Sequence, residues 1–146
     1  MNDYEVRALD IGDLEPLTAL EKECFSDPWT EIMLADSLEN PSVRAIGAFD
    51  GEILIGYLMW MALPPDCEIL NIACKPSYRR QGVAGALFGY CRRENGRNVS
   101  HYMLEVRDSN APARALYAKL GFMPVAVRRN YYKNPKEDAI LMDLYL

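Results

Sequence analysis

One acidic residue in an otherwise apolar stretch is the first feature of the chain that could do chemistry. Glu105 lies between Leu104 and Val106, in a stretch that predicts an interior β-strand. A buried carboxylate needs a partner, a raised pKa or open access to a cleft. The residue is also near the carboxyl end of its strand, where open α/β sheets place ligand sites. The pattern indicates a carboxylate that serves a ligand site or, alternatively, one half of a structural ion pair. The candidate arginine partners are Arg107, Arg128 and Arg129.

A second chemical feature is a glycine-containing loop that precedes a predicted helix. Its sequence is Arg79-Arg80-Gln81-Gly82-Val83-Ala84-Gly85. A helix N-terminus offers free backbone N–H groups and a positive dipole end, which together suit a diphosphate. Gly82 lets the backbone approach a ligand, and the small Ala84 and Gly85 keep side chains out of its path. The alternative is a polar strand-to-helix turn. The loop is neither a P-loop nor the dinucleotide fingerprint.

Alternating strands and helices must position these residues. Helices are predicted after Asp10 or Asp13, at Thr30 up to Pro41, from Gly82 to Asn95-Gly96, and after Ser109 or Asn110 up to Gly121. Strands are predicted over residues 4–8, 43–49, 53–62, 67–74, 102–106, 122–131 and 139–144. Turns at Asp50-Gly51 and at residues 133–136 make two hairpins. The sequence therefore predicts a mixed α/β sheet in one domain over residues 1–146.

Composition and charge narrow the function classes. The chain has 146 residues, half of them hydrophobic, and a net charge of -5, which argues against a general nucleic-acid binder. The four cysteines form no C-x-x-C pair and His101 is the only histidine, so we expect no metal site. The first residues lack the basic and apolar regions of a signal peptide, and no apolar run is long enough to span a bilayer. We therefore expect no membrane partner and a cytoplasmic location.

The loop and the strand before it resemble a known enzyme family. Arg79-x-x-Gly82-x-Ala84 is similar to the Q/R-x-x-G-x-G/A signature of the GCN5-related N-acetyltransferases (GNAT superfamily). Residues 70–76 resemble that family's fourth strand, which ends in a V/C-x-P turn, carries a bulge and splays from its neighbour. The resemblance implies a mostly antiparallel sheet, splayed at the fourth strand and flanked by about four helices. It also implies acetyl-CoA as co-substrate. The expected contact residues are Ile72, Ala73, Cys74, Arg80, Gln81, Gly82, Val83, Ala84, Gly85 and Asn110.

A second stretch narrows the resemblance to one subfamily. Residues 104–110, Leu-Glu-Val-Arg-Asp-Ser-Asn, followed by Ala115-Leu116-Tyr117 and Leu120-Gly121-Phe122, resemble the RimI-type ribosomal-protein alanine N-acetyltransferases. Residues 25–29 and 128–132 also resemble it, so the match covers nearly the whole chain. One departure is Ala84, where many members have glycine. The resemblance implies that Glu105 is the general base and that Tyr117, seven residues after Asn110, protonates the departing thiolate.

Several of these assignments have a structural alternative. Tyr117 has the spacing of a buried helical stripe with Ala113, Leu116 and Leu120, and Asn110 could be an N-cap only. We expect direct transfer to the amine, with backbone N–H groups near Ile72 to Cys74 stabilising the oxyanion. A covalent route through Cys74 is not expected, because no histidine lies nearby in sequence to activate the thiol.

The acceptor that the subfamily resemblance implies is the N-terminal alanine of a small-subunit ribosomal protein. Acidic side chains, among them Asp138, would suit a basic N-terminal tail, and Trp29, Tyr131 and Tyr132 would line its path. Each of these residues could equally be a solvated charge or a packing aromatic. Two other functions stay open. One is acetylation of lysine side chains or a small amine, and the other is a non-catalytic acyl-CoA sensor.

Overall fold

Strand pairing organises the computed structural model, which describes residues 4–133 and 135–146. Residues 1–3, where a signal peptide would begin, lie outside the described residues. Asn134 of the predicted last turn also lies outside them. Neighbouring strands are hydrogen-bonded in the order β1-β2-β3-β4-β5-β7-β6. The chain divides into two compact units, residues 4–62 with 69–96 and residues 63–68 with 97–146. Strand β4 contributes residues to both.

The first unit begins with two helices that follow the first strand. The bounds are β1 (Glu5–Ala8), η1 (Ile11–Asp13), α1 (Leu14–Cys24) and α2 (Glu31–Glu39). Asp10 caps η1 by accepting from the Gly12 N–H, whereas Asp13 precedes α1 without a side-chain cap bond. Asp10 therefore caps the 3₁₀ turn that precedes α1, and Asp13 accepts from the Asp10 N–H at 2.9 Å. Thr30 caps α2 by accepting from the Met33 N–H at 3.2 Å, as its residue type predicts.

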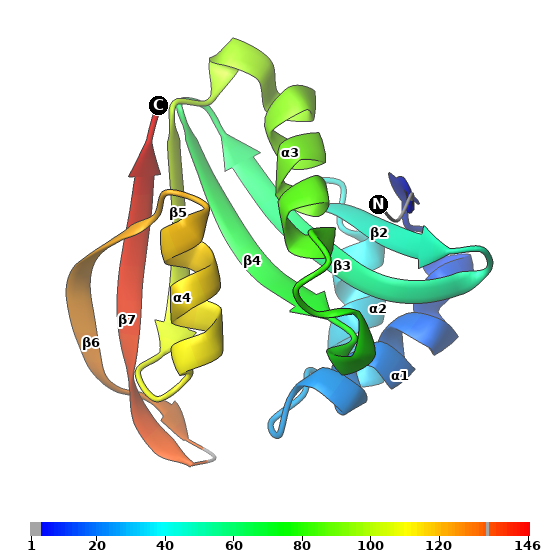
Figure 1. Ribbon diagram of the computed structural model, residues 1–146, viewed down its shortest axis with the longest axis horizontal. Helices are drawn as coiled ribbons and strands as arrows, with labels where there is room; N and C mark the ends of the chain where they lie inside the picture. Colours follow the sequence, from blue (N-terminus) through cyan, green and yellow to red (C-terminus); the bar gives the residue numbers. More distant parts are fainter. Residues whose placement is uncertain (1–3, 134) are drawn as a thin grey trace. The chain divides into compact units, whose positions relative to one another are not determined.

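A strand hairpin and a third helix complete this unit (Figure 1). They are β2 (Arg44–Asp50), β3 (Ile53–Leu63), β4 (Asp66–Cys74), η2 (Pro76–Tyr78) and α3 (Val83–Asn95). Alternate residues of β3 serve opposite faces, as strand geometry requires. Tyr57 and Met59 pack with Leu17, Leu20 and Leu34 of α1 and α2. On the other face, a Cβ at Gly56 would lie 2.9 Å from Val83 of α3, so glycine is what permits α3 to pack this closely.

The second unit contains the start of β4 and the last three strands. Its elements are η3 (Gly96–Asn98, of which Gly96 belongs to the first unit), β5 (His101–Arg107), α4 (Ala111–Lys119), β6 (Met123–Lys133) and β7 (Lys136–Tyr145). Strand β5 pairs with β4 in parallel over Asp66–Glu68, and both strands continue beyond this short ladder. The β1–β2, β2–β3, β5–β7 and β6–β7 pairings are antiparallel. The fold is thus the mixed, mostly antiparallel α/β sheet with four α-helices that the sequence predicts.

Candidate active site

The loop before α3 has the backbone geometry that close approach to a ligand requires. Arg80 and Gly82 adopt left-handed backbone angles, with φ of 65° and 80°. Gly82 is the N-cap of α3, and a Cβ there would meet no heavy atom within 4 Å. The same is true of Gly85 one turn later. This cradle, open at both glycines and facing a helix N-terminus, suits the diphosphate of coenzyme A.

Two side chains of the loop tie it to neighbouring segments. Gln81 accepts a hydrogen bond from the Tyr4 hydroxyl and donates to the Ser77 carbonyl. The Arg79 Nε donates to the Cys74 carbonyl at 3.4 Å, which ties the loop to the end of β4. Val83 and Ala84 are buried. Of the predicted contact residues in this loop, Val83 and Ala84 therefore offer backbone groups rather than side chains.

The end of β4 places the three residues predicted to face the acetyl arm. Ile72 and Ala73 are buried, and the Ile72 N–H donates to the Asn71 Oδ1 at 3.1 Å. The Ile72 N–H therefore already has a hydrogen-bond acceptor within the protein. Burial raises the pKa of the Cys74 thiol, which keeps the sulfur protonated and poorly nucleophilic near neutral pH.

Glu105 lies in the second unit among groups that can hold or share a proton. It pairs with Leu141 in the β5–β7 register, and its side chain is 26% exposed. The Tyr131 hydroxyl donates a hydrogen bond to its carboxylate, which raises the pKa of Tyr131. The Arg128 guanidinium lies 3.6 Å from Glu105 Oε1 and is itself half exposed. Ion pairs this exposed contribute only about 0–1 kcal/mol. The carboxylate is therefore reachable from solvent and is not locked in a strong ion pair.

The strand register decides which of the candidate arginines meets Glu105. Arg107 lies 3.3 Å from Glu137 and stacks over the Tyr132 ring, and Arg129 lies 3.8 Å from Asp138. The predicted structural ion pair thus exists, with Arg128 as its cation. The Glu105 carboxylate stays partly exposed beside this arginine.

A bulge in β6 sets the direction of the tyrosines predicted to line the acceptor path. Asn130 has φ of 54° at the register shift between Arg128 and Tyr132, and its N–H donates to Asp138 Oδ1 at 2.8 Å. Asp138 therefore anchors this bulge, a structural role that the sequence did not predict. Tyr131 is exposed beside the Glu105 carboxylate. Burial, with the charge of Glu105, raises the pKa of Tyr132 to about 12.

Helix α4 positions the predicted proton donor. Tyr117 is the buried residue of this helix, and its ring meets Phe122 edge-on, so the helical-stripe interpretation is correct about its packing. Burial, with a smaller contribution from Tyr132, raises the pKa of Tyr117 well above its usual range. The phenol therefore stays protonated near neutral pH, as a proton donor must be. Asn110 caps α4 by accepting from the Ala113 N–H at 3.2 Å.

Among the described charged side chains, the most deeply buried is one for which we predicted no role from the sequence. Glu21 of α1 is 1% exposed. Its carboxylate accepts from the Trp29 N–H, the Tyr57 hydroxyl and Asn71 Nδ2. Trp29, predicted to line the acceptor path, is thus held through its backbone and packs against the core of the first unit.

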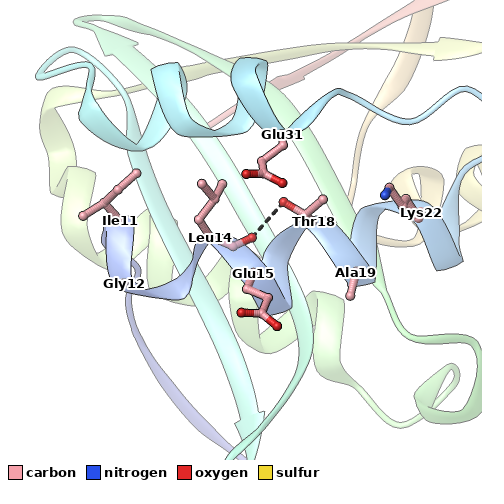
Figure 2. Close-up of a pocket in the computed structure, with 8 residues that line it drawn as sticks. All are labelled: Ile11, Gly12, Leu14, Glu15, Thr18, Ala19, Lys22 and Glu31. Atoms are coloured by element: carbon pink, nitrogen blue, oxygen red, sulfur yellow. Dashed lines mark hydrogen bonds between the residues drawn. The ribbon is translucent and has the colours of Figure 1, made fainter.

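A surface pocket also opens in the first unit, beside η1, α1 and the start of α2. Its volume is about 640 Å³, and it is lined by Ile11, Gly12, Leu14, Glu15, Thr18, Ala19, Lys22 and Glu31. Figure 2 shows the Thr18 hydroxyl turned back to the Leu14 carbonyl of its own helix, a bond of 2.8 Å. The pocket contains none of the residues that the sequence singles out for chemistry.

The predicted site residues thus fall into two groups. The loop, the end of β4 and Trp29 belong to the first unit, whereas Glu105, Asn110, Tyr117, Tyr131, Tyr132 and Asp138 belong to the second. Among the described residues there is no group of three or more His, Cys, Asp or Glu side chains arranged to hold a metal ion. Within the same residues, no helix is both long and apolar enough to cross a membrane.

Known proteins resemble the chain along almost its whole length. A protein of Bacillus subtilis (strain 168) is 36% identical over 143 residues, covering 94% of this chain and 92% of its own. The [ribosomal protein bS18]-alanine N-acetyltransferase of Escherichia coli (strain K12) is 33% identical over 142 residues, covering 95% of each chain.

Solved structures agree on the fold. The crystal structure of the ribosomal-protein-S18-alanine N-acetyltransferase from Escherichia coli superposes with a TM-score of 0.88 at 32% identity, over 98% of this chain and 94% of that one. Arabidopsis thaliana NAA60 in complex with acetyl-CoA has a TM-score of 0.86 at 19% identity over 99% of each chain, a likeness of fold alone.

Residues 14–122 match the acetyltransferase (GNAT) family. This range contains the loop before α3, Glu105 and Tyr117, the residues predicted from the sequence to bind acetyl-CoA and transfer its acetyl group. The chain is therefore an acyltransferase that belongs to the acetyltransferase (GNAT) family and uses acetyl-CoA.

Proposed function

We propose that the chain acetylates the N-terminal alanine of a small-subunit ribosomal protein of the S18 type, in the cytoplasm and as a single domain over residues 1–146. One observation carries the choice of acceptor. The Escherichia coli enzyme named for that reaction is 33% identical over 95% of both chains, so its likeness extends to the regions around Trp29 and Tyr131 as well as to the loop that binds the coenzyme.

Glu105 is the general base in this proposal. An N-terminal amine has a reference pKa of about 8, so it arrives mostly as an ammonium and must lose a proton before it can attack. The Glu105 carboxylate accepts that proton, directly or through water, while the Tyr131 hydroxyl that donates to it fixes its orientation. Arg128, 3.6 Å away and half exposed, can move aside when the substrate cation arrives.

In this proposal Tyr117 and Asn110, the N-cap of α4, serve the leaving group. Because burial raises the pKa of Tyr117, its hydroxyl retains the proton that the coenzyme thiolate needs. Asn110 holds the first turn of α4 and has a remaining N–H₂ group that can bond to the coenzyme. Acetyl-CoA supplies the activated acetyl group, and positioning of the two bound substrates provides much of the rate.

Transfer is direct, without an acetyl-enzyme. The Cys74 thiol, whose pKa burial raises, is a weak nucleophile. Cys24, which donates to the Cys74 carbonyl at 3.4 Å, has a pKa raised to about 11, chiefly by burial. Neither thiol lies in an environment that produces a thiolate at neutral pH.

A panel of acceptors tests the proposal. The enzyme and acetyl-CoA are incubated with a short basic peptide that begins with alanine, with the same peptide blocked at its N-terminus and carrying an internal lysine, and with a polyamine. Mass spectrometry should find one acetyl group, on the alanine α-amine of the free peptide alone. Acetylation of the lysine side chain or the polyamine would establish the other acceptor class, and no product with any amine would favour the acyl-CoA sensor.

A further inference from the structure

The buried carboxylate of Glu21 joins three separate parts of the first unit. It comes from α1 and meets the Tyr57 hydroxyl of β3, the Asn71 side chain of β4 and the backbone of Trp29. Burial raises the pKa of Glu21, so a carboxylate at this position is costly to the fold. A residue that serves only to fill the core would not need a charge there.

The donors around Glu21 are matched to an ionised carboxylate. Oε1 accepts from the Tyr57 hydroxyl and from Asn71 Nδ2 at 3.2 Å, while Oε2 accepts from the Trp29 N–H at 2.8 Å. Three donors need an acceptor with two oxygens, which a carboxylate provides and a carboxamide does not. The bond to Trp29 is therefore the one that depends on the second oxygen.

The segment that Glu21 holds is residues 25–30, between α1 and α2, which we call the acceptor loop. It lies next to the end of β4, because Cys24 at the end of α1 donates to the Cys74 carbonyl at 3.4 Å. Asn71, which bonds to Glu21, also accepts from the N–H of Ile72. A single carboxylate thus connects the acceptor loop to the strand predicted to contact the acetyl arm.

We propose that Glu21 is a positioning residue that fixes the acceptor loop beside the end of β4, so that Trp29 forms one wall of the path by which the acceptor amine reaches the acetyl group. The proposal rests on the acetyl-transfer function above. It assigns Glu21 no contact with either substrate, and its effect passes through the Trp29 backbone.

Two variants separate this role from a general contribution to stability. Glu21→Gln keeps the shape and one oxygen, which stays with Tyr57 and Asn71 and turns an N–H₂ group toward the Trp29 N–H. Tyr57→Phe removes a donor from the same buried network but leaves both oxygens of Glu21 in place. Both variants should lose stability in urea unfolding, and only Glu21→Gln should release the acceptor loop.

The expected result is a split between the two substrates. With the acceptor that the panel identifies, Glu21→Gln should raise the peptide KM by about tenfold to a hundredfold, the size of a lost hydrogen bond to a charged group. Its kcat at saturating peptide and its Kd for acetyl-CoA should stay within about twofold, well below the tenfold that corresponds to 1.4 kcal/mol. Tyr57→Phe should leave the peptide KM near that of the wild type. Equal increases in KM for the two variants, or no increase for Glu21→Gln, would overturn the proposal.

Amide hydrogen exchange at Trp29 gives a readout that does not need turnover. In the wild type, the Trp29 N–H should be protected, in Tyr57→Phe it should remain so, and in Glu21→Gln it should exchange much faster than amides of the neighbouring helices. A Trp29 amide that exchanges freely in the wild type would refute the anchoring, even if Glu21→Gln does not fold. Protection at Trp29 without activity on any amine would instead show that the proposed function has failed.

Discussion

Replacement of Gly82 by valine tests the assignment of the loop before α3. The backbone at this residue has φ of 80° and ψ of 9°, a left-handed conformation that costs an L-residue about 1–2 kcal/mol. A Cβ would meet no protein atom within 4 Å, so the valine side chain would project into the open cradle. It would prevent the close approach of the backbone to the diphosphate, and the Kd for acetyl-CoA should rise well over tenfold, or by more than about 1.4 kcal/mol.

A matched control separates this effect from backbone strain. Gly51, in the turn between β2 and β3, also has a positive φ, of 62°, and open space around its Cβ. Gly51→Val should lose about the same 1–2 kcal/mol of stability and bind acetyl-CoA as the wild type does. Strain of this size leaves a domain of ordinary stability, about 5–15 kcal/mol, almost fully folded. Calorimetric titration with acetyl-CoA that finds the same Kd for Gly82→Val and Gly51→Val would refute the assignment.

Three further predictions follow from the burial and charge of single side chains. Tyr117→Phe should lower kcat without rescue at high pH, because the lost group supplies a proton; a pH–rate profile that recovers at alkaline pH would contradict this. Cys74→Ala should retain turnover, and isolation of an acetylated Cys74 that passes its acetyl group to peptide would overturn direct transfer. Partial burial lowers the pKa of His101, but Asp66 at 2.9 Å and Asp143 at 3.3 Å raise it more, so the net pKa is raised. The stability from this cluster should therefore be complete below about pH 6.5 and decline as pH rises through the raised pKa; urea unfolding should show that decline in the wild type and not in His101→Gln.

Features encoded by neighbouring residues could be predicted from the sequence. The loop from Arg79 to Gly85 and the helix after it were found because Gly82 and the Asn95-Gly96 pair mark both ends of α3. Thr30 and Asn110 cap their helices as their residue types predict. Each of these features depends on the backbone conformation of a few consecutive residues. The residue types at those positions control that conformation directly.

Features that depend on distant partners could not be predicted in the same way. The burial of the Glu21 carboxylate could not be predicted, because the partners that make it tolerable, Tyr57 and Asn71, come from strands distant in the sequence. The choice of Arg128 over its two neighbours as the cation near Glu105 depends likewise on the β5–β7–β6 register and on the bulge at Asn130. Neither register nor bulge is encoded locally.

The central claim, that Glu105 is the base of an acetyl transfer to an amine, is tested most directly by steady-state kinetics of Glu105→Gln. The variant keeps the shape of the side chain, so its kcat should fall by roughly 10²–10⁴, its affinity for acetyl-CoA should be nearly unchanged, and raising pH above the amine pKa of about 8 should restore part of the rate. Glu68→Gln, which removes a carboxylate that acts on Tyr131 only through its charge, is the control and should keep near-normal kcat. If folded Glu105→Gln retains nearly full activity at neutral pH, Glu105 is only the structural partner of Arg128 and another group accepts the proton.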